Sequence, residues 1–307
     1  MLAPTTPRSD YRLGLGAVIA SVSAWGLTSV IIKSIDMDAI AIAFWRFLIY
    51  AAMLTVWMYA RGGRLSWSVF RITFPAGLLL GGDVVLFFTA VKVTNVVNAT
   101  TIGALQPLVI ASFASHLFGE RIRRREVVAA IVAIAGVIVI ITQSSGTPAW
   151  SGAGDLAAVG ALFCWSGYFV YTKRVSTQVS AFPYTTGTAW WTTAIALPVG
   201  LAFGQDMSPP PEGEWAPLIL LLLVGGVIGH LLMNWGISRV PLWLSSTLTL
   251  LIPVLSSIAA WIWLDEPLNE VQLVAMGVVV GALAVIVTAQ STPAPLQPAD
   301  CPADAVP

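Results

Sequence analysis

The residues of this sequence that could do chemistry are a few polar side chains set within long apolar stretches. Asp83 and His230 are ionisable and lie near the middle of two such stretches. A charge in hydrocarbon costs free energy, so groups of this kind usually face a cavity or a partner. Asp83 has two interpretations: it carries a proton or meets an ammonium group, or it pairs with Arg46. His230 either titrates near neutral pH or packs as a hydrogen-bonded side chain.

Two tryptophans, Trp25 and Trp165, lie midway along apolar stretches. Membrane proteins place most tryptophans at the membrane–water interface, whereas one at mid-depth, whose N–H needs a partner, suits the wall of a cavity. Helix–helix packing is the alternative interpretation. At helical spacing each tryptophan shares a face with polar or aromatic residues, which are Thr28 and Ser29 beside Trp25, and Tyr168 and Phe169 beside Trp165.

Three amides and two prolines complete the set of candidate site residues. In hydrocarbon an amide needs a hydrogen-bond partner, so Asn98, Gln106 and Asn234 either line a pathway or join helices. Pro107 and Pro253 each remove a backbone donor and clash with the preceding turn, so they predict kinks in two helices. Such kinks are either hinges for moving helices or static bends.

Glycines recur within the same stretches. Small residues let helices approach closely in a membrane. We expect this role inside the bundle, and for Gly277 and Gly281 an interface between two copies is the alternative. The glycines are Gly81, Gly82, Gly225, Gly226, Gly229, Gly277 and Gly281.

Several other kinds of chemistry find no support. The sequence has no glycine-rich phosphate loop followed by lysine, so no nucleotide cofactor is predicted. Two cysteines, Cys164 and Cys301, are too few for a disulfide framework or a metal cluster. The formal net charge is zero, which does not favour a nucleic-acid partner. We expect no catalytic residue, cofactor, metal or obligate protein partner.

The apolar stretches determine the fold class. Charged residues make up 10% of the chain and hydrophobic residues 57%, with a mean hydropathy of +0.84, whereas a soluble domain carries about 25% charged residues. A membrane-spanning helix needs about 20 apolar residues. Ten stretches qualify and predict an all-α polytopic protein embedded in the lipid bilayer, at about 14–33, 39–59, 72–91, 96–118, 126–143, 154–173, 183–204, 216–237, 243–264 and 270–289.

Lysine and arginine predict the orientation of these helices. If the N-terminus is cytoplasmic, twelve of these residues fall on the cytoplasmic side and two, Lys33 and Lys92, on the other side. Short cytoplasmic loops of membrane proteins are enriched in positive residues. The sequence therefore predicts that both termini face the cytoplasm.

The sequence also contains an internal repeat. Five spans in each half, an odd number, make the two repeats inverted, which is typical of secondary transporters with a binding site at the repeat interface. The aligned pairs are Pro107 with Pro253 and Glu120 with Glu266 at an offset of 146 residues, and Trp25 with Trp165 and Lys33 with Lys173 at an offset of 140.

The repeat divides the chain into two similar parts around a central cavity. We expect a cytoplasmic N-terminal segment 1–12, a first five-helix repeat 13–143, a periplasmic linker 144–153, a second repeat 154–289 and a disordered cytoplasmic tail 290–307.

The repeated blocks resemble a known family. The blocks are Leu-Gln-Pro at 105–107, Phe-Gly-Glu-Arg at 118–121 and Ala-Ile-Ala-Gly-Val at 133–137, with a second copy of the pattern from 252 to 278. They are similar to the drug/metabolite transporter superfamily, more narrowly to ten-helix EamA-type exporters, and most of all to YddG-type exporters of aromatic and hydrophobic amino acids. The resemblance implies a secondary transporter of the bacterial inner membrane that exports small, partly apolar metabolites by alternating access.

Two rival functions remain open at this point. One is an exporter of many lipophilic drugs, and the other is a membrane receptor or enzyme without flux. Proton-coupled and passive transport, the conformational state and the number of copies in the assembly are likewise open.

Overall fold

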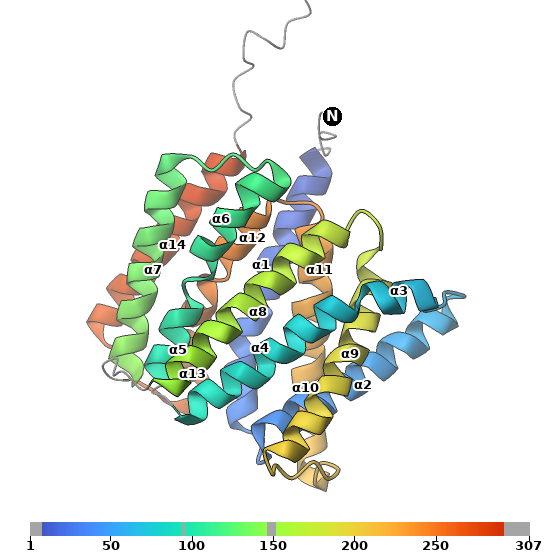
Figure 1. Ribbon diagram of the computed structural model, residues 1–307. Coiled ribbons are helices and arrows are strands. Elements are labelled where there is room, and N and C mark those ends of the chain that lie inside the picture. The colour runs from blue at the N-terminus through green and yellow to red at the C-terminus, as the bar shows by residue number, and fades with distance from the viewer. Residues whose placement is uncertain (1–7, 94–95, 146–151, 292–307) are drawn as a thin grey trace, which may run out of the picture.

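The computed structural model describes residues 8–93, 96–145 and 152–291, and all regular elements in them are helices (Figure 1). Eight helical segments are long and apolar enough to cross a membrane, and Phe74–Phe87 is a shorter apolar segment. The prediction of an all-α polytopic protein is confirmed. Most of the predicted linker and tail lies outside the described residues.

The first half of the chain supplies seven helical elements. They are α1 (Arg8–Lys33), α2 (Ala39–Ala60), α3 (Trp67–Ile72), α4 (Phe74–Val93), α5 (Val96–Gly103), α6 (Gln106–Phe118) and α7 (Arg124–Ser145). The second half supplies α8 (Ala153–Val175), α9 (Ala181–Ala202), η1 (Glu212–Glu214), α10 (Trp215–Leu221), η2 (Leu222–Leu231), α11 (Leu232–Ile237), α12 (Leu242–Leu248), α13 (Leu251–Leu264) and α14 (Glu270–Ser291).

Two of the predicted spans are interrupted for two residues just before their prolines, with the backbone at Leu105 and Leu250 still in the right-handed helical region. The fourth span divides between α5 and α6, and the ninth between α12 and α13. A proline ring clashes with the carbonyl four residues before it, and those positions are Gly103, the last residue of α5, and Thr249, just after α12. Pro107 and Pro253 then lie in the first turn of α6 and α13, where a missing N–H costs little.

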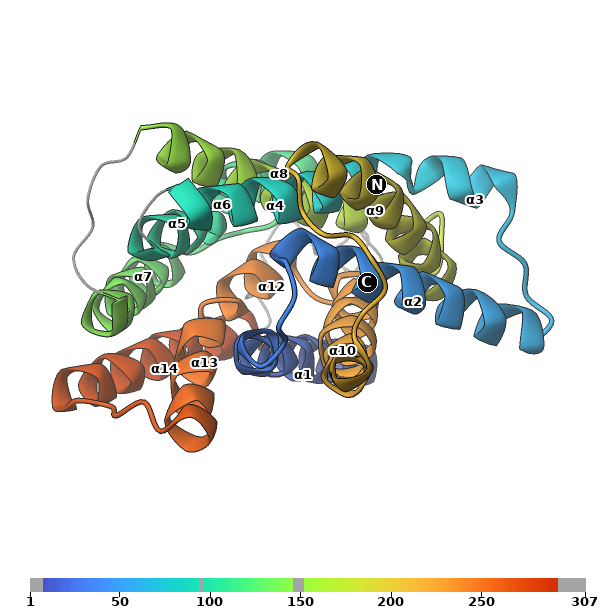
Figure 2. The same cartoon turned by 90° about the horizontal axis from the view of Figure 1, so that it is seen from below.

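Helix packing repeats between the two halves. α4 packs along α8, and the counterpart of α4, formed by α10, η2 and α11, packs along α1. α2 packs against its counterpart α9. α7 packs against its counterpart α14, and Figure 2 shows these two helices side by side at one end of the molecule. α1 and its counterpart α8 run in opposite directions in Figure 1, as inverted repeats require.

Both described ends of the chain lie on one face of the bundle. α1 begins and α14 ends at the top of Figure 1, and we call this side the terminal face. α1 ends at Lys33 on the other side, which we call the opposite face.

The glycines take two different roles. A Cβ at Gly229 would collide with the Trp25 indole, and one at Gly226 would lie 3.2 Å from the Tyr50 ring, so these glycines permit close contact with α1 and α2. A Cβ at Gly277 or Gly281 would meet nothing within 4 Å. The predicted packing role inside the bundle is therefore wrong for the last two glycines, because α14 turns them away from its neighbours.

Candidate functional site

A cavity of about 380 Å³ lies between the two halves of the chain. Its wall includes Ile32, next to the end of α1, and Ile42, near the start of α2, so it extends from the middle of the bundle toward the opposite face. The lining side chains at mid-depth include Trp25, Thr28, Arg46, Phe47, Asp83, Gln106, Trp165, His230 and Pro253.

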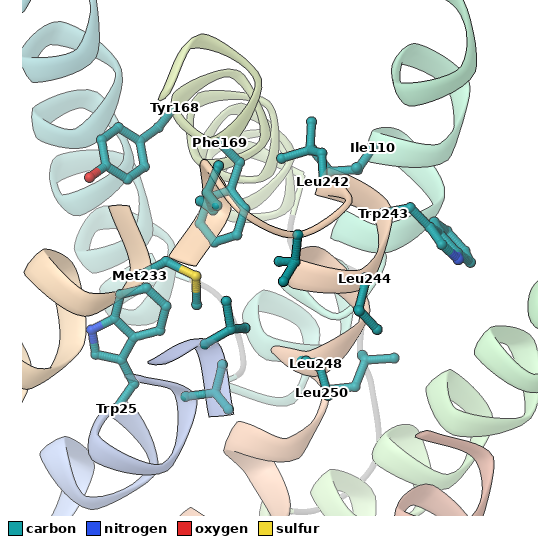
Figure 3. Close-up of a cluster of buried hydrophobic side chains, with 14 of the residues drawn as sticks. Trp25, Ile110, Tyr168, Phe169, Met233, Leu242, Trp243, Leu244, Leu248 and Leu250 are labelled. Atoms are coloured by element: carbon teal, nitrogen blue, oxygen red, sulfur yellow. The ribbon is translucent and has the colours of Figure 1, made fainter. Parts of the chain in front are cut away.

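Toward the terminal face the cavity is closed by packed side chains. Tyr168, Phe169, Met233, Leu242 and Leu244 are each at most 1% exposed, and Figure 3 shows Tyr168, Phe169 and Leu242 above Trp25 in that view. They come from α8, α11 and α12, all elements of the second half. The structure is therefore a conformation in which the cavity reaches toward the opposite face.

An aromatic group forms one wall of the cavity. The rings of the equivalent tryptophans Trp25 and Trp165 meet edge to face, with centroids 5.3 Å apart and an interplanar angle of 63°. His230 lies 5.2 Å from Trp25 and 5.6 Å from Phe47. Aromatic rings offer a large apolar surface, so this wall can receive an apolar or aromatic side chain.

The two tryptophans differ in how firmly they are held by other residues. The indole N–H of Trp25 donates to the carbonyl of Gly225 at 3.2 Å, so Trp25 also joins α1 to η2. Trp165 lines the cavity with part of its ring exposed. Trp165 is therefore the freer of the two to contact a bound molecule.

The segment η2 (Leu222–Leu231) is a π-helix, a rare form in which some carbonyls lose their usual helical partners. Three of its carbonyls accept hydrogen bonds from side chains of other helices. The donors are Ser21 to Gly229 at 2.5 Å, Trp25 to Gly225 at 3.2 Å and Tyr50 to Gly226 at 2.8 Å. The glycines at 225, 226 and 229 indicated close packing in the sequence, but not a π-helix.

Arg46 and Asp83 both line the cavity but do not pair. Within the described residues, Lys33 and Glu266 form an ion pair at 2.7 Å, and none joins Arg46 to Asp83. The Arg46 guanidinium lies 4.9 Å from the centre of the Phe47 ring. The sequence suggested Arg46 only as a partner of Asp83, whereas the structure places it in the cavity wall.

Gln106 connects the two broken helices. Its Oε1 accepts a hydrogen bond from the Thr249 hydroxyl at 3.1 Å, and Thr249 also donates to the carbonyl of Ser246 at 2.6 Å. The Gln106 Nε2 is buried without a partner among the described residues. The breaks of α5–α6 and α12–α13 thus meet at the floor of the cavity.

Three predicted cavity residues lie outside it. The Tyr168 hydroxyl donates to Asn234 Oδ1 at 2.8 Å, and Asn234 Nδ2 donates to Thr185 at 2.9 Å. Phe169 is fully buried beside them. They lie nearer the terminal face than the cavity-lining residues of their own helices, so they belong to the layer that closes the cavity. The side chains of Ser29 and Asn98 are not among those described.

Comparisons with known proteins agree with this architecture. Residues 12–142 and 152–288 match the EamA-like transporter family. The chain is 28% identical to the transporter YyaM of Bacillus subtilis over 254 residues, which cover 78% of this chain and 82% of that protein. It is 27% identical over 211 residues to the aromatic amino acid exporter YddG of Ancylobacter novellus, covering 66% and 65%. A solved crystal structure shares the fold, with a TM-score of 0.77 and 24% identity over 92% of this chain and 99% of the other.

Proposed function

Because this chain belongs to the EamA-like transporter family, we propose that it is a secondary transporter that exports amino acids with aromatic or other hydrophobic side chains. Family membership makes it a multi-pass membrane transporter of small molecules rather than an enzyme. The exporter of aromatic amino acids among its relatives supports the choice of cargo, and so does the chemistry of the cavity.

The residues that line the cavity are the main support for this proposal. It combines an aromatic wall, contributed by Trp25, Trp165 and Phe47, with two oppositely charged side chains, Arg46 and Asp83. An amino acid combines an apolar side chain with a positive and a negative group. The volume of about 380 Å³ lies at the lower end of the range for ligand pockets, roughly 300–1,000 Å³, which favours a small metabolite over a bulky drug.

We assign the remaining lining residues by their chemistry. Thr28 and Gln106 offer hydrogen bonds, and His230 presents a buried Nδ1 that has no partner among the described residues. Asp83 receives the ammonium group of the cargo or a transported proton, since both roles need a carboxylate that faces the cavity. The breaks before Pro107 and Pro253 serve as hinges.

The orientation follows from the positive residues of the loops. We propose that the terminal face is cytoplasmic, in the inner membrane of a bacterium, since twelve lysines and arginines fall on that side. The cavity then faces the periplasm, as in an exporter that has delivered its cargo. Alternating access requires a second state in which the layer around Phe169 and Leu242 opens and the periplasmic side closes.

Flux through purified protein in vesicles tests the function. Proteoliposomes loaded with a mixed panel of amino acids should release phenylalanine, tryptophan and leucine faster than glutamate or lysine, because the cavity wall is largely apolar. Efflux is measured by mass spectrometry with and without a pH gradient, against protein-free vesicles. Release of lipophilic dyes without competition by any amino acid would favour a drug exporter. Binding without release of any compound would indicate a receptor.

A further inference from the structure

We propose that Arg46 is the anion-binding residue of the cavity and holds the carboxylate of the cargo. This inference rests on the proposed function and specifies how a transported amino acid is recognised. It would make a free carboxylate, rather than an aromatic ring alone, the requirement for transport.

The Arg46 guanidinium lies between η2 and the cavity. Arg46 lies seven residues into α2 from Ala39, about 10 Å along the helix axis, and lines the cavity. A Cβ on Gly225 would lie 3.4 Å from both the Arg46 Cζ and Nη2. The guanidinium therefore lies against η2, with the Phe47 ring 4.9 Å away on α2.

The charge of Arg46 has no counterion among the described residues. No ion pair joins it to a carboxylate there, its Nε is buried without a partner, and the nearby Tyr50 hydroxyl already donates to the carbonyl of Gly226. A cation held in an apolar cavity without a counterion is costly unless a ligand supplies one. Guanidinium groups bind carboxylates through two parallel hydrogen bonds, which makes a carboxylate the fitting ligand.

The aromatic wall begins beside this anion site. Phe47 and His230 are in ring contact at 5.6 Å, and His230 and Trp25 at 5.2 Å, so the wall runs from Arg46 to the tryptophans. A carboxylate at Arg46 therefore leaves an apolar side chain against Trp25 and Trp165. An amino acid meets both demands, whereas its amide or its decarboxylated amine meets only the second.

The test compares phenylalanine with phenylalaninamide in proteoliposomes. The wild-type protein should transport phenylalanine with a kcat/KM at least tenfold above that of the amide. Arg46→Met should lower the kcat/KM for phenylalanine by about 100-fold, as expected for loss of a charge-assisted contact, and leave the amide unchanged. The matched control is Arg61→Met, directly after the same helix, whose guanidinium lies 5.1 Å from the Trp57 ring and does not line the cavity.

The outcomes separate this inference from the proposed function. Equal transport of phenylalanine and its amide by the wild type would overturn the role of Arg46 and leave amino acid export intact. Absence of amino acid transport by the wild type would overturn the proposed function itself. If Arg46→Met fails to fold, Arg46→Lys decides, because a retained positive charge should keep the preference for phenylalanine and lower only its kcat/KM.

We also infer, from a different observation, that Glu120 and Lys173 form a latch that keeps the terminal face closed. Glu120 follows α6 and reaches across to the second half of the chain. Its carboxylate accepts hydrogen bonds from the backbone N–H of Leu242 at 2.5 Å and of Trp243 at 2.9 Å. These are the first amides of α12, which have no helical partner of their own.

Lys173 binds the other end of residues 237–243, which we call the α11–α12 connection. Its Nζ donates to the carbonyls of Ile237 at 2.8 Å and Val240 at 2.6 Å, where α11 ends. A negative group at a helix start and a positive group at a helix end both favour the helix dipole. Burial raises the pKa of Glu120, while its two amide donors and the charge of Lys173 favour the ionised form.

The repeat provides a comparison on the opposite face. Lys33 and Glu266 are the counterparts of Lys173 and Glu120, but they bond to each other at 2.7 Å and are 61% and 51% exposed. On the closed terminal face, Glu120 and Lys173 therefore bind backbone groups of the α11–α12 connection. On the opposite face, Lys33 and Glu266 bind each other, with no backbone partner among the described residues. This difference indicates that releasing Glu120 and Lys173 from the α11–α12 connection accompanies opening of the terminal face.

Cysteine labelling tests the latch. Ser245 is fully buried on α12, one turn after the latched residues, so Ser245→Cys in a Cys164→Ser, Cys301→Ser background should react slowly with a maleimide in proteoliposomes. Glu120→Gln and Lys173→Met should each raise that rate about tenfold by populating the opened state.

Glu266→Gln is the matched control, because it removes the equivalent carboxylate on the opposite face. It should leave the labelling rate unchanged. The latch is overturned if neither latch variant raises the rate, or if Glu266→Gln raises it equally, which would indicate general loosening. Glu120→Gln and Lys173→Met remove contacts at opposite ends of the α11–α12 connection. One variant that folds is therefore sufficient to test the latch.

Discussion

Replacing Trp165 by alanine should lower the kcat/KM for aromatic amino acid export by about 30- to 100-fold. Trp165 lies part-exposed in the cavity wall and contacts Trp25 at 5.3 Å, Phe169 at 4.9 Å and His230 at 6.4 Å. Each aromatic contact contributes about 0.5–1.5 kcal/mol, and a cargo ring stacked on this wall makes more than one of them. A loss of roughly 2.0–2.7 kcal/mol in transition-state binding corresponds to the stated factor.

Initial rates of phenylalanine efflux from proteoliposomes measure this effect. Trp263→Ala is the matched control, since Trp263 is 62% exposed on α13 and does not line the cavity. Trp165→Phe should keep part of the activity because it retains a ring. Trp165 is a better probe than Trp25, whose N–H also holds η2 through Gly225. Efflux by Trp165→Ala at the wild-type rate would remove Trp165 from the binding site.

Replacing Gly77 by alanine should destabilise the fold by about 3 kcal/mol, at the upper end of the usual cost of overpacking. A Cβ at Gly77 would collide with the Cβ of Trp191 and would lie 3.2 Å from the Thr188 carbonyl oxygen. These atoms are backbone, or are bonded directly to it, so no side-chain rotation relieves the contact. α4 and α9 would have to move apart.

Trp191 is also fixed by its own contacts. Its indole N–H donates to the carbonyl of Phe70 at 2.8 Å, and its ring stacks on Phe70 at 4.5 Å. Thermal unfolding in detergent should show a melting temperature lower by roughly 5–10 °C. Gly277→Ala should not lower it, because that Cβ points into open space and alanine favours a helix by about 1 kcal/mol over glycine. Equal melting temperatures for Gly77→Ala and the wild type would contradict the close packing of α4 and α9.

The structure was most predictable from the sequence where it depends on local properties. The length of each apolar stretch and the stereochemistry of proline belong to short segments, so the helical spans and the neighbourhood of both breaks were predictable. The interruption of each helix lies two to four residues before its proline. The pairing of Trp25 with Trp165 was predictable in position, because the internal repeat relates them.

Only the tertiary structure decided which of the candidate residues share a cavity. Tyr168 and Asn234 are an aromatic and an amide side chain, like Trp165 and Gln106 in the cavity wall, yet they bond to each other in the layer that closes the cavity. Arg46 faces the cavity without pairing with Asp83.

The conformational state and the latch also depend on contacts between distant segments. Glu120 reaches Leu242 across 122 residues, and Gln106 meets Thr249 across 143. The amino-acid sequence by itself determined the spans, their inverted repetition and the polar groups that they contain. The packing of the two repeats against each other determined which of those groups are free to bind a ligand, because a hydrogen bond between distant residues satisfies one group and leaves its neighbour exposed to the cavity.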